Sequence, residues 1–189
     1  MSKKDETKIE AVSPYNDDSL IQSQETVGFT CGAFDLLHAG HAMMLEEARK
    51  QCDYLVVGVQ TDPSIDRPEK NAPVQTFEER LTMVKSIRWV DKVCIYDTEE
   101  SLVHLLKKIT PDVRIVGADW KGKKFTGHDL PINVYFNSRD HGYSTSDLRD
   151  RVFNAELEKR NADSRKKAAE SSVANLDMAD KKGTNNVYR

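Results

Sequence analysis

Short apolar runs alternate with segments of helical periodicity through the middle of the chain. Residues 54–59 (YLVVGV) are apolar on both faces, and just before them Met44, Leu45 and Ala48 share one helical face. The same alternation predicts strands over residues 26–31, 54–59, 90–96, 113–116 and 132–136, and helices over residues 41–51, 76–87 and 101–109. Thr76 with Glu79 three residues later predicts a capping box at the second helix. Strands buried on both faces that alternate with helices favour an α/β fold, a Rossmann-like three-layer sandwich with a central parallel sheet.

Both ends of the chain lack this pattern. Residues 1–25 are polar without periodicity, and residues 158–189 mix charge, Ser, Asn and Ala with few large apolar groups. We therefore expect a disordered N-terminal extension over residues 1–25, one domain over residues 26–157, and a polar tail over residues 158–189 that is partly helical or disordered. A helix starting near Ser146 can extend to about Lys167 on composition alone.

Composition narrows the function classes. The formal net charge of -3 argues against a chain built to coat nucleic acid or an anionic membrane, and the basic residues 165–167 lie in a tail that also carries acids. Cys31, Cys52 and Cys94 have no CxxC spacing and adjoin apolar stretches, which predicts buried thiols in a reducing compartment. No apolar run approaches the length of a membrane span, and the first residues contain no apolar signal-peptide core. We expect a cytoplasmic protein with no membrane or nucleic-acid partner.

Candidate chemistry follows the first predicted strand. Ligands of open parallel sheets bind beyond the carboxyl ends of the strands, and there His38 and His41 bracket Gly40 at a predicted helix start. The helix dipole and free N–H groups favour an anion, Gly40 permits close approach of backbone, and imidazoles add donors for phosphate. The alternative is that both histidines only cap the helix or pack in the loop. Neither a P-loop nor a dinucleotide-binding motif is present, and no third His or Cys lies at ligand spacing, so we expect no zinc site.

Residues 32–41, GAFDLLHAGH, resemble the HxGH nucleotidyltransferase superfamily, and most closely its glycerol-3-phosphate cytidylyltransferase group. Further matches in the family's order are YLVVGVQTD (54–62), FEER (77–80), IRWVD (87–91), GADWKG (117–122) and RDHGYSTS (139–146), so the resemblance covers about residues 27–149. It implies that an acceptor phosphate oxygen attacks the α-phosphorus of a nucleoside triphosphate and that pyrophosphate leaves.

The resemblance also implies roles for single residues. His38 and His41 would stabilise the α-phosphate and the leaving pyrophosphate, while Lys70 would reach the α-phosphate or the acceptor. Arg139 would meet the triphosphate, and Arg80 and Arg88 would contact the acceptor phosphate or hold the site together. The residues expected around the nucleotide are Gly32, Ala33, Phe34, Gly40, Asp119, Trp120, Gly142, Tyr143, Ser144 and Thr145. Mg²⁺ would accompany the triphosphate, held by phosphate oxygens and water with no protein ligand expected.

The chain departs from that group at several places. Pro68, with Arg67 beside it, stands where the group has a lysine, and in the RTEGIST segment Asp140, His141 and Tyr143 replace Thr, Glu and Ile. These changes leave the base and the acceptor open. Asp35, just before the histidines, is expected to fix the loop.

Our main interpretation is a cytidylyltransferase that joins CTP to a small phosphorylated alcohol, such as glycerol 3-phosphate, and acts as a homodimer. An adenylyltransferase of the same superfamily that uses ATP and a sugar phosphate would have the same fold and the same histidines. A non-catalytic nucleotide-binding module is the third interpretation. Such a module is expected to lose His38, His41 or Arg139, and all three are present.

Overall fold

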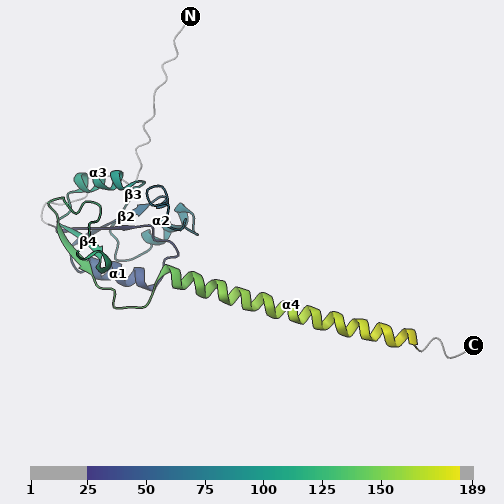
Figure 1. The fold of residues 1–189 in the computed structure, drawn as a ribbon. Helices are drawn as coiled ribbons and strands as arrows, with labels where there is room; N and C mark the ends of the chain where they lie inside the picture. The colour runs from purple at the N-terminus through teal and green to yellow at the C-terminus, as the bar shows by residue number, and fades with distance from the viewer. Residues whose placement is uncertain (1–24, 184–189) are drawn as a thin grey trace, which may run out of the picture. The chain divides into compact units, whose positions relative to one another are not determined.

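A single parallel sheet organises the chain in a computed structural model that describes residues 25–183 (Figure 1). Its five strands have the order β3-β2-β1-β4-β5. The strands are β1 (Val27–Gly32), β2 (Tyr54–Gln60), β3 (Lys92–Tyr96), β4 (Val113–Gly117) and β5 (Asn133–Asn137). The helices are α1 (Ala39–Arg49), α2 (Phe77–Lys85), α3 (Glu99–Ile109), the 3₁₀ turn η1 (Ala118–Trp120) and α4 (Thr145–Gly183). The predicted α/β fold with a central parallel sheet is confirmed.

Two apolar clusters cover the opposite faces of the sheet. On one face, α1 and α2 pack Leu45 and Val84 against Val57 of β2. On the other face, α3 packs Leu106 into a cluster that contains Val56, the neighbouring residue of β2. Successive strand residues point to opposite faces, so one strand supplies both clusters, which is why its sequence is apolar throughout. Figure 1 shows α3 and α1 on opposite sides of the sheet.

The helices begin where their capping residues stand. Thr76 Oγ1 accepts the Glu79 N–H at 3.2 Å and Glu79 Oε2 accepts the Thr76 N–H at 2.7 Å, so the predicted capping box of α2 is confirmed. The third helix starts at Glu99, two residues before the predicted position, because Thr98 caps it by accepting the Ser101 N–H. The short turn η1 after β4 was not predicted.

The cysteines and α4 complete the description. Cys31, Cys52 and Cys94 are free thiols, the last two buried and Cys31 partly so.

Helix α4 runs to Gly183, beyond the predicted limit near Lys167. Contacts divide the chain into residues 1–145 and 146–189, and the domain boundary expected at residue 157 stays a prediction. The disorder expected at the N-terminus falls on residues outside the described part, apart from residue 25. None of the helices between residues 25 and 183 is long and apolar enough to cross a bilayer.

Candidate active site

The carboxyl ends of β1 and β4 lie side by side where the sheet changes its winding direction. From β1 the chain crosses through α1 to β2, whereas β4 is entered from α3 on the other face. A crevice between diverging loops is expected at such a point, which is the usual ligand position in open α/β sheets. The loop after β1 therefore meets the segments that follow β4 and β5.

The loop after β1 is held in a strained conformation. Phe34 and Leu36 have φ values of 53° and 47°, in the left-handed region that costs a non-glycine residue roughly 1–2 kcal/mol. Asp35 lies between them, and its Oδ1 accepts the N–H groups of Val74 and Gln75 at 2.9 and 3.0 Å. Asp35 thus has the loop-fixing role expected from the sequence, and these bonds help to maintain the strain.

Arg80 clamps the same loop from the opposite side. Its guanidinium is buried and donates to the carbonyls of Ala33 at 2.7 Å, Gln60 at 2.6 Å and Thr61. Burial also lowers the pKa of Arg80. The side chain therefore joins the loops after β1 and β2, which is the second of the two roles expected for it. Arg88 is exposed, and its guanidinium carbon lies 4.0 Å from the centre of the Trp89 ring.

His38 and His41 form a stacked pair at the start of α1. Their ring centroids are 4.1 Å apart. His38 Nδ1 accepts the Gly40 N–H at 3.1 Å, and His41 Nδ1 accepts the His38 N–H at 3.3 Å. Because each Nδ1 is an acceptor, the proton of each neutral imidazole must be on Nε2. The local backbone thus sets both tautomers and leaves two Nε2–H donors at the positive end of the helix.

Burial keeps His41 neutral. It lowers the pKa of His41 from its ordinary 6.5 to about 4, and the neighbouring His38 and Arg139 side chains act in the same direction. At neutral pH the His41 ring is a hydrogen-bond donor without a full charge. Such a donor can follow charge that develops on phosphate without first losing a proton.

Residues from the other end of the domain reach this pair. Thr145 Oγ1 lies 3.4 Å from His38 Nε2 and donates to the carbonyl of Asp35 at 3.4 Å. Arg139 forms an ion pair with Asp119, and both side chains are exposed. The structure thus brings Arg139, Asp119 and Thr145 to the histidines' side of the sheet. Their contacts with a nucleotide stay a prediction.

Glu47 is a site-forming residue that sequence reasoning missed. Its carboxylate accepts from Tyr135 Oη at 3.0 Å, from the Ser138 N–H at 2.8 Å and from Ser138 Oγ at 3.1 Å. Burial alone would raise the pKa of Glu47, but these donated hydrogen bonds and one from Asn137 lower it overall. The carboxylate holds the end of β5 against α1. No pattern within a single sequence marks a glutamate for this contact.

His141 is a second residue whose position was not predicted. A Cβ placed on Gly40 would lie 2.8 Å from His141 Cε1 and 2.9 Å from His38 Cε1. Both rings therefore crowd the same Cα, and only glycine fits at this position. One feature of the sequence could have pointed to His141: it is a third histidine, at a position where the cytidylyltransferase group that the chain resembles has glutamate.

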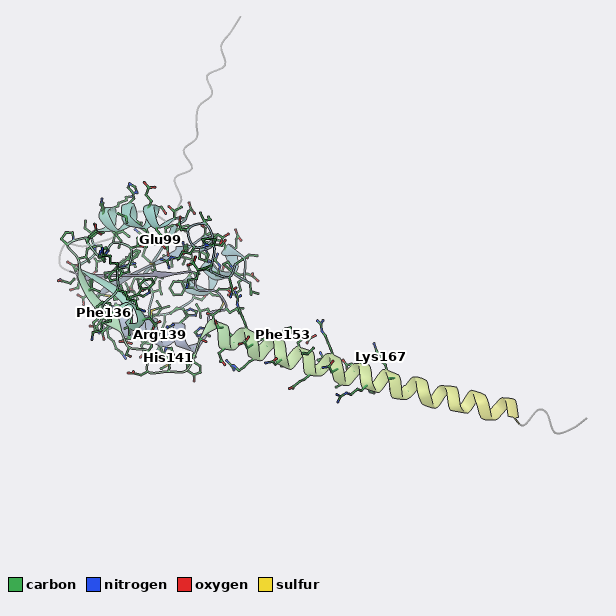
Figure 2. All side chains as sticks on the ribbon, in the orientation of Figure 1. Glu99, Phe136, Arg139, His141, Phe153 and Lys167 are labelled. Atoms are coloured by element: carbon green, nitrogen blue, oxygen red, sulfur yellow. The ribbon has the colours of Figure 1, made fainter. Side chains whose placement is uncertain are left out.

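Lys70 and Trp120 line a separate cleft of about 680 Å³ on the α3 side. Segments after β2, at the start of α3 and after η1 form it. Arg67 pairs with Glu99 at 2.5 Å and lies 5.7 Å from the centre of the Trp120 ring, and Glu99 also accepts the Thr126 hydroxyl. Figure 2 shows Glu99 toward α3, and Arg139 and His141 toward α1.

The other predicted residues fall in two segments beside the histidines. The segment from β1 into α1 contains Gly32, Ala33, Phe34 and Gly40, and the segment before α4 contains Gly142, Tyr143 and Ser144. Within residues 25–183, no three His, Cys, Asp or Glu side chains are grouped as ligands for a metal ion.

Comparisons with known proteins agree with this geometry. A family model described as cytidylyltransferase-like matches residues 29–151. The bifunctional protein HldE of Campylobacter concisus is 35% identical over 151 residues, which cover 79% of this chain and 32% of that protein. HldE of Caulobacter vibrioides is 38% identical over 127 residues, covering 65% of this chain and 26% of that protein. The chain thus spans about a third or less of these relatives.

A solved structure extends the comparison to the fold. The lipopolysaccharide core biosynthesis protein from Thermoplasma volcanium superposes with a TM-score of 0.53 and 25% sequence identity. The match covers 62% of this chain and 99% of that protein.

Proposed function

The chain belongs to the cytidylyltransferase-like family of HxGH nucleotidyltransferases, and from this premise we propose that it transfers AMP from ATP to a sugar phosphate. Membership of the family supports an enzyme of the nucleotidyltransferase class, while the nucleotide and the acceptor are the proposal. The observation that carries it is the stacked pair of His38 and His41, which presents two Nε2–H donors at the start of α1.

The proposed reaction is an in-line displacement at phosphorus. An acceptor phosphate oxygen forms a bond to the α-phosphorus of ATP, and the bond from that phosphorus to the oxygen bridging the β-phosphate breaks. Pyrophosphate leaves with the electron pair, and a phosphate dianion needs no base to attack. Negative charge grows on the α-phosphate and on the leaving group, where Nε2–H of His38 and His41 and the Arg139 guanidinium would donate hydrogen bonds.

For the acceptor, the proposal is a position along the carboxyl edge of the sheet, with the phosphate toward the histidines and the sugar in the cleft on the α3 side. Arg80, expected from the resemblance to hold the acceptor phosphate or the site, already donates to three carbonyls. The cleft is lined by three cations, two aromatic rings and four carboxylates: Arg67, Lys70, Lys124, Trp120, Phe125, Glu69, Glu99, Glu100 and Asp129. Cations suit a phosphate, and apolar rings beside polar groups suit the mixed surface of a sugar.

The relatives favour the same acceptor class. Similarity to the HldE proteins fits adenylyl transfer to a sugar phosphate better than cytidylyl transfer to an alcohol phosphate. The Thermoplasma protein is described by its part in lipopolysaccharide core biosynthesis. That core is an oligosaccharide, so its assembly consumes activated sugars. A nucleotide-linked sugar is the product that this chain would make.

Magnesium is the implied cofactor. The ion would be held mainly by the triphosphate oxygens and water. When bound, the ion would neutralise part of the triphosphate charge.

Transfer of CMP from CTP to glycerol 3-phosphate is the second candidate. The family model's description and residues 32–41, which resemble that enzyme group, both favour it.

A paired substrate screen separates the two candidates. ATP and CTP are each incubated with hexose 1-phosphates, heptose 1-phosphates and glycerol 3-phosphate, and pyrophosphate release is measured while mass spectrometry identifies the product. We expect turnover with ATP and one class of sugar phosphate, giving an ADP-sugar. Faster formation of CDP-glycerol would establish the second candidate, and no turnover with any pair would contradict both.

A further inference from the structure

His141 packs directly on the start of α1. Its Cε1 and that of His38 lie within 3 Å of the position that a Cβ on Gly40 would occupy. The ring is also tilted by 35° against Tyr143, with 5.7 Å between the two ring centroids. His141 is thus a third imidazole beside the stacked pair, supplied by the segment between β5 and α4 rather than by the HxGH motif.

One nitrogen of this ring is not satisfied by the protein. Nδ1 of His141 is buried and has no hydrogen-bond partner among the described residues. Buried polar atoms are nearly always paired in folded proteins, because an unpaired one loses its bond to water without replacement. By contrast, Nδ1 of His38 and Nδ1 of His41 both accept backbone N–H groups.

The surroundings of the ring favour an anionic partner. His38 and His41 present Nε2–H donors at the same helix start, and Arg139 lies two residues before His141. Arg139 and His141 both act to lower the pKa of His41, so both side chains lie near that ring, whereas Asp35 acts in the opposite direction. Asp119 pairs with Arg139.

We propose that His141 is a further substrate-binding residue of this site, and that its Nδ1–H donates a hydrogen bond to a phosphate oxygen of the bound nucleoside triphosphate. The inference rests on the proposed nucleotidyltransferase function. Glutamate at this position, as in the resembled cytidylyltransferase group, has no N–H to donate and would repel the phosphate. Histidine in place of glutamate at position 141 therefore adds a phosphate contact that the HxGH motif alone does not provide.

Binding measurements on the full chain test this contact. The probes are ATP and inorganic pyrophosphate, and dissociation constants are measured by calorimetry for wild type, His141→Phe and His141→Asn. Phenylalanine keeps a ring over Gly40 but removes both nitrogens, whereas the asparagine amide lies near the position of Nδ1. His104→Phe, an exposed histidine on α3, is the matched control.

We expect His141→Phe to weaken binding of both probes by about tenfold or more, as for loss of a hydrogen bond to a charged group. His141→Asn should recover most of the affinity, His104→Phe should bind as wild type, and all melting temperatures should agree within about 2 °C. In turnover assays, the KM for ATP should rise in His141→Phe more than kcat falls.

Three results would overturn the inference. Wild-type affinity in His141→Phe, with ATP turnover intact, would remove the contact and leave the proposed function standing. Equal losses in the Phe and Asn variants, accompanied by lower melting temperatures, would show that the ring only packs. If wild type bound neither ATP nor pyrophosphate, the proposed function would fall together with the inference.

Discussion

His38 has two roles that belong to different nitrogens. Nδ1 caps α1 by accepting the Gly40 N–H, while Nε2 faces the proposed phosphate site and lies 3.4 Å from Thr145 Oγ1. A substitution can therefore remove one role and keep the other. His41 differs from His38 in that burial lowers the pKa of its ring, and neighbouring side chains lower it further.

Substitution of His38 should separate capping from catalysis. Asparagine is a good N-cap, so His38→Asn should keep the stability of the fold but lower turnover by about a hundredfold or more. His38→Ala should lose turnover equally and also lose about 1 kcal/mol of unfolding free energy. Pyrophosphate release and urea denaturation measure the two effects. Near-normal turnover in His38→Asn would contradict the catalytic role.

The lowered pKa of His41 predicts a pH-dependent stability. The folded protein holds this ring with a pKa of about 4, whereas the unfolded chain has the ordinary 6.5. As the pH falls from 6.5 toward 4, the unfolded chain binds the proton first, so unfolding becomes easier. His41→Gln lacks this contribution. The difference in unfolding free energy between variant and wild type should shift in the variant's favour below pH 6.5 and stay constant above it.

Denaturation of both proteins by urea at pH 7.5, 5.5 and 4.5 measures that difference. If the unfolding free energies of wild type and His41→Gln differed by the same amount at all three pH values, His41 would not be buried in its neutral form.

Helix α2 supports the loop that carries the histidines through Arg80. Its Arg80 joins carbonyls from two loops, at sequence separations of 47 residues for Ala33 and 20 for Gln60. Sequence patterns predicted where α2 begins because its capping box is local. These patterns could not decide whether Arg80 contacts the acceptor phosphate or holds the site together. Its carbonyl partners lie in segments that are distant in the sequence.

Removal of the Arg80 clamp should destabilise the protein. Arg80→Met leaves three carbonyls without this donor, and we expect a loss of about 2–3 kcal/mol in unfolding free energy together with reduced turnover. Arg88→Met, at an exposed position just after the end of α2, is the stability control, with an expected change of about 0.5 kcal/mol or less. Urea denaturation compares them, and equal losses would contradict the clamp.

Glu47 should affect nucleotide binding from a distance. Glu47→Ala removes three hydrogen bonds that hold β5 and Ser138 to α1. Arg139 follows Ser138 directly and His141 lies two residues further on, so we expect the KM for ATP to rise several-fold while kcat changes less. Glu46→Ala is the matched control, since Glu46 pairs only with exposed Lys50 among the salt bridges of the described chain. A similar KM in both variants would rule out this tether.

At the scale of the whole molecule, the sheet unit and the long helix differ in composition and packing. Side chains between residues 158 and 168 are exposed, and no residue with a predicted chemical role lies among them. Removal of residues 158–189 should therefore leave turnover within about twofold and the melting temperature within about 2 °C. Light scattering on the full and shortened chains also tests the homodimer expected from the resemblance. A large loss of turnover would give the tail a role in the site.

The amino-acid sequence by itself determined the parallel α/β fold, the order of its elements and the HxGH helix start. Each of these follows from local signals: apolar periodicity, capping residues and a short motif. Only the tertiary structure decided that Arg80 clamps two loops, that Glu47 holds β5, that Lys70 lies in a cleft on the α3 side and that His141 crowds Gly40. These depend on which strands become neighbours, and strand order joins residues up to about a hundred positions apart, beyond the range of any local pattern.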